Sequence, residues 1–255
     1  MSQISFRKTF FLTLGFSLFL LPAFAVAQEA TPHWSYDGAS DPGHWGSLGA
    51  AFAACSTGHM QSPINIKDTE KTQLQPLMMN YKAVPLNIID NGHTVQITYP
   101  GGSTLSVNGV TYTLKQFHFH HPAEEHVNGK KYDLVAHLVH ADAGGNLAVI
   151  AVLFTKGAPN PLFDNLWKNL PTEQGKAATV ASVSVNVTDL VPQDTGYFHY
   201  MGSLTAPPCS EGVTWFVLKT PMTISAEQLA VFAKLYPHNA RPIQPTNGRK
   251  IEESK

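Results

Sequence analysis

Short runs of apolar and β-branched residues, separated by turn signals, fill the middle of the chain. Three such runs cover residues 86–89, 94–98 and 104–107, and Asn-Gly or Pro-Gly-Gly sequences follow them. Asn-Gly is a strong signal for a two-residue hairpin turn, because both residues tolerate the positive φ that this turn requires. The pattern therefore predicts antiparallel strands joined by tight turns.

Three longer runs follow, at residues 112–120, 132–140 and 147–154. The last run is almost continuously apolar, which is typical of a strand covered on both faces, so these runs are expected to form the centre of a sheet. Helical pattern is scarce. Residues 161–170 predict one short helix and residues 225–235 a second, with Ser225 as its cap. The predicted class is mainly β with a few short helices.

The first residues have the organisation of a secretory signal peptide. Arg7 and Lys8 precede an apolar run, residues 10–24, and small residues follow at Ala25 and Ala27. The run is shorter than a bilayer-spanning helix requires, and the small residues suit a signal peptidase, so a signal peptide explains it better than a membrane anchor. We expect cleavage after Ala27, with residues 28–255 as the mature periplasmic or secreted domain.

The mature chain of about 228 residues could bury one large β domain or two smaller ones. No linker, low-complexity stretch or repeat of fixed period divides it, which favours one domain. The whole chain has a formal net charge of −1, and loss of Arg7 and Lys8 makes it −3. Such a charge gives no indication of nucleic acid or an anionic membrane surface as a partner.

Cys55 and Cys209 are the only cysteines in the sequence. In an exported chain, an even and minimal count is most simply explained by one disulfide bond. Two free thiols that bind a metal are the alternative, but zinc sites of that kind usually have paired Cys-x-x-Cys spacing, which this chain lacks. We therefore predict a disulfide bond between Cys55 and Cys209.

Histidines at alternating positions give the strongest chemical signal. In the strand predicted at 112–120, His118 and His120 lie on one face and two phenylalanines on the other, because strand side chains alternate. The strand predicted at 132–140 can supply His137 beside them. Three imidazoles facing one point are difficult to explain without a metal, and a catalytic zinc site needs three protein ligands and one open position. The pattern therefore predicts a zinc site.

Several motifs match, in order and spacing, those of one enzyme family. They are QSPINI (61–66), NGH (91–93), QFHFH (116–120), EEH (124–126), KKYDLVAHLVH (130–140), LAVIAVLF (147–154), GSLTAPPCSEGVTWFVL (202–218) and NARPIQP (239–245). From about Trp34 to Arg249 the sequence resembles the α-carbonic anhydrases. The resemblance implies one catalytic domain built on a large, mostly antiparallel twisted β-sheet. It also implies one Zn²⁺ per chain, held by His118, His120 and His137, and reversible hydration of carbon dioxide to bicarbonate and a proton by zinc-bound hydroxide.

The same resemblance implies roles for residues around the metal. Thr205 would accept the hydrogen bond of the hydroxide and donate its own proton to Glu125. His93 would be the proton shuttle, a task that suits an imidazole pKa near 6.5. Gln116 would support the first ligand by hydrogen bonding. The positions that match the substrate-binding wall are Val139, Val149, Leu204, Thr205, Ala206, Val213 and Trp215.

Two positions depart from the family pattern. Most members carry a Glu two residues before the third zinc ligand, where it accepts a hydrogen bond from that histidine; here the position is Val135. Loss of such a partner typically costs 10- to 100-fold in metal affinity or activity, so the sequence predicts a looser zinc site unless another group substitutes. Ala206 stands where many relatives carry a second Thr. The missing hydroxyl would alter ligand affinities without removing catalysis.

Two other interpretations use the same residues. A cupin-type metalloenzyme also has an H-x-H motif followed by a Glu, here Glu124 or Glu125, but the Gly expected seven residues later is Lys131 or Tyr132. A non-catalytic carbonic anhydrase-like zinc-binding protein is the second alternative, although the ligands, Glu125 and Thr205 are all present. The expected partners are small molecules, carbon dioxide and bicarbonate, without nucleic acid or, after cleavage, a membrane. Bacterial relatives of this type are often dimers, so a homodimer is a possible assembly.

Overall fold

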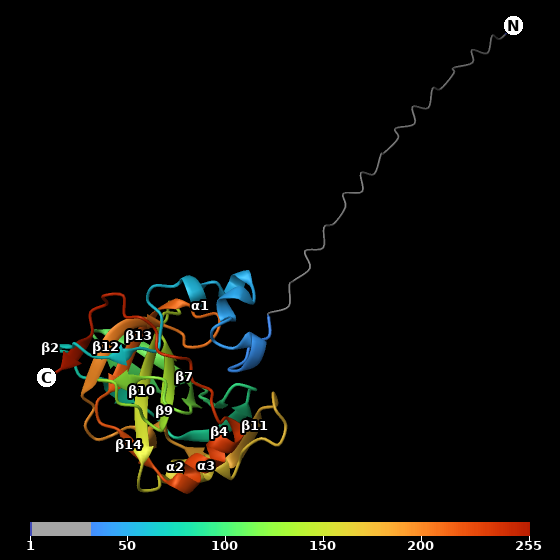
Figure 1. The fold of residues 1–255 in the computed structure, drawn as a ribbon. Helices are drawn as coiled ribbons and strands as arrows, with labels where there is room; N and C mark the ends of the chain where they lie inside the picture. Colours follow the sequence, from blue (N-terminus) through green and yellow to red (C-terminus); the bar gives the residue numbers. More distant parts are fainter. Residues whose placement is uncertain (2–31) are drawn as a thin grey trace. The chain divides into compact units, whose positions relative to one another are not determined.

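One large twisted sheet holds most of the strands (Figure 1). The computed structural model describes Met1 and residues 32–255, so the predicted signal peptide and its cleavage site lie outside the described residues. The sheet has 13 strands: β2 (Glu70–Thr72), β3 (Met78–Asn80), β4 (Val84–Asp90), β5 (Val95–Thr98), β6 (Thr104–Val107), β7 (Val110–His120), β9 (Leu134–Ala141), β10 (Leu147–Lys156), β11 (Ala178–Val185), β12 (Tyr197–Ser203), β13 (Glu211–Leu218), β14 (Met222–Ile224) and β15 (Glu252–Ser254). A separate two-stranded sheet joins β1 (Asn65–Ile66) to β8 (His126–Val127).

The strand order of the large sheet is β11-β4-β5-β7-β9-β10-β13-β12-β15-β2. Parallel pairing occurs in this sheet where β10 meets β13 and β14 and where β15 meets β2. The other pairs of the sheet are antiparallel. The prediction of a mainly β chain with a large, mostly antiparallel sheet is confirmed.

The central strands bury both of their faces. In β10, the even-numbered residues from Ala148 to Phe154 belong to the larger apolar cluster, and the odd-numbered residues from Val149 to Leu153 belong to a smaller one. This alternation confirms that residues 147–154 form a strand covered on both sides. In the neighbouring strands β7 and β9, the same alternation leaves one face for the larger cluster and the other for the histidines.

Three short α-helices and four 3₁₀ segments complete the described part of the chain. They are α1 (Ala54–Thr57), α2 (Pro161–Trp167), α3 (Ala226–Leu235), η1 (Gly38–Ser40), η2 (Trp45–Ser47), η3 (Ala50–Phe52) and η4 (Val187–Leu190). The side chains of Ser225 and Gln228 form a capping box at the start of α3, as expected for a helix N-terminus. Helices α2 and α3 lie side by side and cover the larger cluster with their apolar faces (Figure 1). Within the described residues, no helix is long and apolar enough to cross a membrane.

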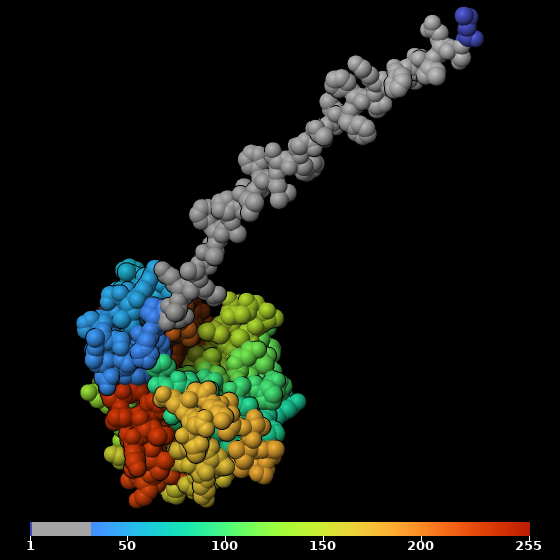
Figure 2. All heavy atoms as spheres, turned by 90° about the vertical axis from the view of Figure 1, so that its right-hand side faces the viewer, coloured from blue at the N-terminus to red at the C-terminus, as the bar shows by residue number. Residues whose placement is uncertain are grey.

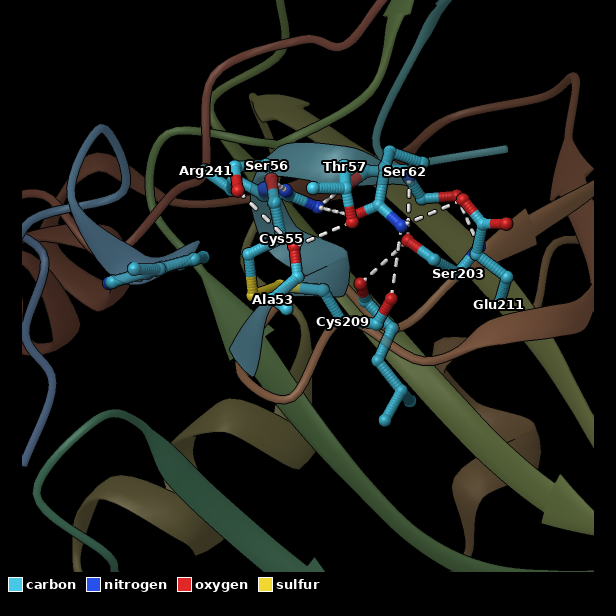
Figure 3. Close-up of a disulfide and its surroundings, with 12 residues drawn as sticks. Ala53, Cys55, Ser56, Thr57, Ser62, Ser203, Cys209, Glu211 and Arg241 are labelled. Atoms are coloured by element: carbon cyan, nitrogen blue, oxygen red, sulfur yellow. Dashed lines mark hydrogen bonds between the residues drawn. A yellow bond between two sulfur atoms is a disulfide. The ribbon is translucent and has the colours of Figure 1, made fainter. Parts of the chain in front are cut away.

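A disulfide bond joins Cys55 in α1 to Cys209 in the loop between β12 and β13 (Figure 3). The prediction of this bond is confirmed. Arg241 donates from Nη2 to the Cys55 carbonyl oxygen at 2.9 Å, and Gln61 donates from Nε2 to the Cys209 carbonyl oxygen at 3.0 Å. The loop that carries Thr205 is therefore tied to the N-terminal part of the chain by a covalent bond and by hydrogen bonds.

The N-terminal segment after Pro32 packs against the C-terminal third of the chain. Figure 2 shows this segment, in blue, next to the red segment around α3. Residues 33–37 and residues 235–238 line one cavity together with Gly92 and His93. The segment thereby brings two aromatic residues, Trp34 and Tyr36, to the edge of the histidine cluster described next.

Candidate metal centre

Three histidines from two neighbouring strands converge on one point. β7 carries His118 and His120, β9 carries His137, and His118 is the register partner of His137. One ring nitrogen from each histidine lies within 4.8 Å of those of the other two. The structure thus brings the three predicted ligands together, because period-two alternation turns both β7 histidines to the side on which β9 presents His137.

Burial keeps two of these imidazoles neutral at ordinary pH. Burial, and next the nearby His137, lower the pKa of His118 to about 3, and the same causes lower the pKa of His120. Among the described residues, His120 Nε2 has no hydrogen-bond partner although it is buried. An unpartnered buried nitrogen is costly, and neutral imidazoles are good ligands for transition metals. These two neutral rings, together with His137, fit a zinc ion better than they fit a purely structural role.

The outer nitrogen of each histidine is held by a different kind of acceptor. His118 Nδ1 lies 2.8 Å from Gln116 Oε1, which agrees with the supporting role predicted for Gln116. His120 Nδ1 lies 2.7 Å from the carbonyl oxygen of Asn239. His137 Nε2 lies 2.9 Å from a carboxylate, Glu125 Oε1. These acceptors favour the N–H tautomers that leave Nε2 of His118, Nε2 of His120 and Nδ1 of His137 free for a metal.

Two consecutive buried carboxylates have different partners. Glu125 contacts His137, whereas Glu124 Oε1 accepts the backbone N–H of Arg241 at 2.7 Å. Burial raises the pKa of Glu124 to about 8, and His137 and, more weakly, the Thr205 side chain are among the groups that lower it. No described hydrogen bond joins Glu125 to Thr205, and Glu124 is the carboxylate whose pKa the Thr205 side chain influences, so the predicted Thr205–Glu125 pair finds no support here. The reason is that consecutive side chains leave the backbone in different directions.

A pocket with one apolar wall opens over the histidines. Its lining residues outside the histidines are Gln116, Val139, Val149, Leu204, Thr205, Ala206, Pro207 and Trp215. Trp215 is fixed by a hydrogen bond from its Nε1 to the carbonyl oxygen of Ser203, at 3.1 Å. Val213 was expected in this wall, but it is absent from the lining and is buried in the smaller apolar cluster instead. The remaining six predicted wall residues all line the pocket.

His93 lies in the turn between β4 and β5, and its ring stacks on Trp34. The two ring centroids are 3.7 Å apart and the planes differ by 7°. Burial, and next the neighbouring His33, lower the pKa of His93. A second cavity, lined by Trp34 and His93 at one side, also touches His118 and His120. Neither Trp34 nor His33 has a role predicted from sequence, because both lie far from His93 along the chain and no local motif connects them to it.

Comparison with known proteins agrees with this geometry. The family model described as eukaryotic-type carbonic anhydrase matches residues 40–255. The chain belongs to the α-carbonic anhydrase family. The carbonic anhydrase of Pectobacterium carotovorum is 43% identical over 239 residues, which are 93% of this chain and 98% of that protein. A family of enzymes is thus assigned over nearly the whole described chain, and the cupin-type alternative is wrong.

Solved structures of carbonic anhydrases have the same fold. A hyperthermostable carbonic anhydrase identified from an active hydrothermal vent chimney superposes with a TM-score of 0.85 at 44% identity, over 88% of this chain and 100% of that one. The α-carbonic anhydrase of Thermovibrio ammonificans, solved with the inhibitor sulfanilamide, also has a TM-score of 0.85, at 41% identity and with the same coverage. At these identities, the α-carbonic anhydrase fold is shown for this chain.

Proposed function

We propose that this carbonic anhydrase catalyses the zinc-dependent, reversible hydration of carbon dioxide to bicarbonate and a proton. The observation that carries the proposal is the cluster of three imidazoles beneath a pocket with one apolar wall. An uncharged substrate offers no charge to bind, so an apolar wall beside a metal centre suits it. The family assignment and its sulfanilamide-bound relative support the same conclusion.

His118, His120 and His137 would hold one zinc ion per chain. When bound by three histidines, zinc lowers the pKa of a water to about 7 and so supplies a nucleophile at neutral pH, a value established on carbonic anhydrases themselves. The buried and unpartnered His120 Nε2 supports this donor set. The side chains that hold the outer nitrogens keep the rings in place and fix their tautomers.

Thr205 and Glu124 would orient the nucleophile. Glu124 Oε1 accepts the Arg241 amide, Glu124 Oε2 is buried without a hydrogen-bond partner among the described residues, and the Thr205 side chain is near enough to lower the pKa of Glu124. Burial favours the protonated acid, but a divalent cation on the histidines favours the carboxylate, which can then accept the Thr205 proton. A hydroxyl has one proton to donate, so a Thr205 hydroxyl that donates to Glu124 can only accept further hydrogen bonds. The nucleophile must then point its own O–H at Thr205, which fixes its orientation.

His93 would carry the product proton from the metal centre to buffer. The proposal is supported by the cavity that touches His93, His118 and His120. The lowered pKa of His93 favours its neutral form at neutral pH, so the ring is ready to accept a proton and releases it readily. Stacking on Trp34 would hold the ring near one orientation.

The wall formed by Val139, Val149, Leu204 and Trp215 would receive carbon dioxide. Ala206 has no hydroxyl, so it leaves bicarbonate one hydrogen-bond donor fewer than a Thr would give. We also propose that residues 1–27 are a signal peptide and that residues 28–255 act in the periplasm or outside the cell. The confirmed disulfide supports export, because such bonds persist in oxidising compartments.

The test is stopped-flow carbon dioxide hydration by residues 28–255, with zinc counted by elemental analysis on the same sample. Fast hydration that disappears on chelation and returns with one zinc per chain is the expected result. One zinc per chain without hydration would instead establish the alternative, a non-catalytic zinc-binding protein. Absence of zinc binding at any concentration would overturn the metal assignment.

A further inference from the structure

We propose that Glu125 is the positioning residue of His137, in place of the carboxylate that the family usually supplies from the position of Val135. This inference deepens the proposed function and rests on it, since it concerns how this chain orients one ligand of the same metal centre. It meets the condition attached to the predicted looser zinc site, because another group substitutes for the Glu that Val135 replaces.

The strand that carries His137 offers it no acceptor side chain on the same face. Val135 is two residues before His137 in β9, so both side chains point to the same side of the sheet. Val135 is fully buried and belongs to the smaller apolar cluster. A valine side chain has no atom that accepts a hydrogen bond, so the partner has to come from another element.

Glu125 supplies this partner from the segment between β7 and β8. Its Oε1 lies 2.9 Å from His137 Nε2, and the residue is fully buried. The residues on both sides are tied to other segments: the Glu124 carboxylate accepts the Arg241 amide, and His126 N–H donates to the Ile64 carbonyl oxygen at 3.3 Å. Glu125 therefore contacts the His137 ring from a segment that is itself held in place, as a positioning role requires.

The acceptor on Nε2 determines which nitrogen of His137 is free. An N–H on Nε2 that donates to Glu125 leaves the lone pair on Nδ1, toward His118 and His120. The other two rings donate to neutral oxygens, those of Gln116 and Asn239. Glu124 Oε1 also lies 3.5 Å from His120 Nδ1, but His137 is the ligand whose outer nitrogen has a carboxylate as its hydrogen-bond partner, at 2.9 Å. A carboxylate raises ligand basicity as well as fixing the ring.

The relocation predicts a specific pattern of variants. Glu125→Gln removes the charge and should weaken zinc binding by 10- to 100-fold. Val135→Glu in the native chain adds a second carboxylate beside the first in a space closed to water, where two carboxylates cannot both ionise at low cost. It should therefore give no tighter zinc binding. Val135→Glu combined with Glu125→Gln should recover most of the lost affinity, because the family's usual arrangement is restored.

The experiment measures zinc affinity by competition with a chelator of known affinity, at pH 7, for wild type, both single variants and the double variant. Glu173→Gln, at an exposed glutamate that pairs only with Lys176 among its described salt bridges, is the matched control and should behave as wild type. In the zinc-loaded protein, ¹⁵N NMR should find a proton on His137 Nε2 in the wild type. Equal affinity of Glu125→Gln and wild type, or tighter binding by Val135→Glu alone, would overturn the inference.

Two other outcomes, a Glu125→Gln variant that does not fold and a wild type that binds no zinc, also have a defined meaning. If Glu125→Gln does not fold, as judged by circular dichroism, the affinity of Val135→Glu alone decides the question, since tighter binding shows that the site lacked a carboxylate. A wild type that binds no zinc would sink the proposed function whatever the variants do. A wild type that binds zinc and hydrates carbon dioxide, with an unaffected Glu125→Gln, would sink only this inference.

Discussion

Reduction of the Cys55–Cys209 bond should destabilise the protein strongly without changing its native site. The two cysteines are 154 residues apart, so the bond closes a loop that spans most of the described chain. In the chain-entropy account, a loop of that length restricts the unfolded ensemble by about 5 kcal/mol at 25 °C. The folded state keeps its other ties, since Arg241 still donates to the Cys55 carbonyl and Gln61 to the Cys209 carbonyl.

The assay is urea unfolding of oxidised and fully reduced protein, with the free energy and the m-value measured for each. Reduction should lower the free energy of unfolding by several kcal/mol and raise the m-value, because the reduced unfolded chain exposes more surface. Hydration activity at 25 °C, below the transition, should stay the same. A variant with both cysteines changed to serine should not respond to the reductant.

Two results would refute this reasoning. Equal free energies of unfolding in the two states would show that the bond does not restrict the unfolded chain. Loss of activity on reduction, at urea concentrations where the protein is still folded, would show that the bond acts on the native loop around Thr205. In that case the effect would appear in the folded site and the entropic account would be wrong.

Three further predictions concern single residues. Burial lowers the pKa of His140 from 6.5 to about 4, so between these pH values the unfolded state binds a proton that the folded state does not. The free energy of unfolding should therefore fall as the pH drops from 6.5 to 4, by at most about 3 kcal/mol. The fall should be smaller in His140→Asn, which lacks the titrating group. Gly202→Ala should destabilise by about 1–3 kcal/mol in urea unfolding, since an added Cβ would lie 2.2 Å from Ser62 Oγ. His33→Asn should raise the pKa of His93 in an NMR titration, because a nearby positive charge disfavours protonation.

Each of these has a direct control. An equal loss of unfolding free energy at acid pH in His140→Asn and wild type would show that groups other than His140 cause it. Gly144→Ala, in an exposed turn, should cost less than Gly202→Ala, and equal costs would contradict the steric argument. An unchanged His93 titration in His33→Asn would leave burial as the whole cause of the lowered pKa.

Much of the fold could be predicted because local pattern and tertiary environment agree. The strand predicted at 104–107 coincides with β6, and the continuous apolar run at 147–154 lies within β10. Boundaries were less accurate: the strand predicted to begin at Tyr132 begins at Leu134. The parallel pairing of β10 with β13 joins residues 66 positions apart, such as Val149 and Trp215, and hydrophobic alternation carries no information about it.

The positions of site residues on strands could be predicted from alternation, whereas those of site residues in loops could not. His118 and His120 share a face of β7 by period two, and register brings His137 beside them. Glu124 and Glu125 lie outside the strands, so no periodicity says which of them contacts Thr205 and which contacts His137. The close stacking of Trp34 on His93 depends on the path of the N-terminal segment, and that path has no local signal in the sequence.

The adjacency of Glu124 and Glu125 has a consequence for how this chain tolerates change. Insertion or deletion of one residue between His120 and His126 would displace both carboxylates together, and with them two separate contacts of the metal centre. In a relative that takes the carboxylate partner of the third ligand from the strand equivalent to β9, the two carboxylates lie on different elements. A change of loop length would then displace one carboxylate and leave the other in place. Loops usually accept changes of length, but in this chain residues 121–125 should be kept at fixed length in any loop graft or directed-evolution library.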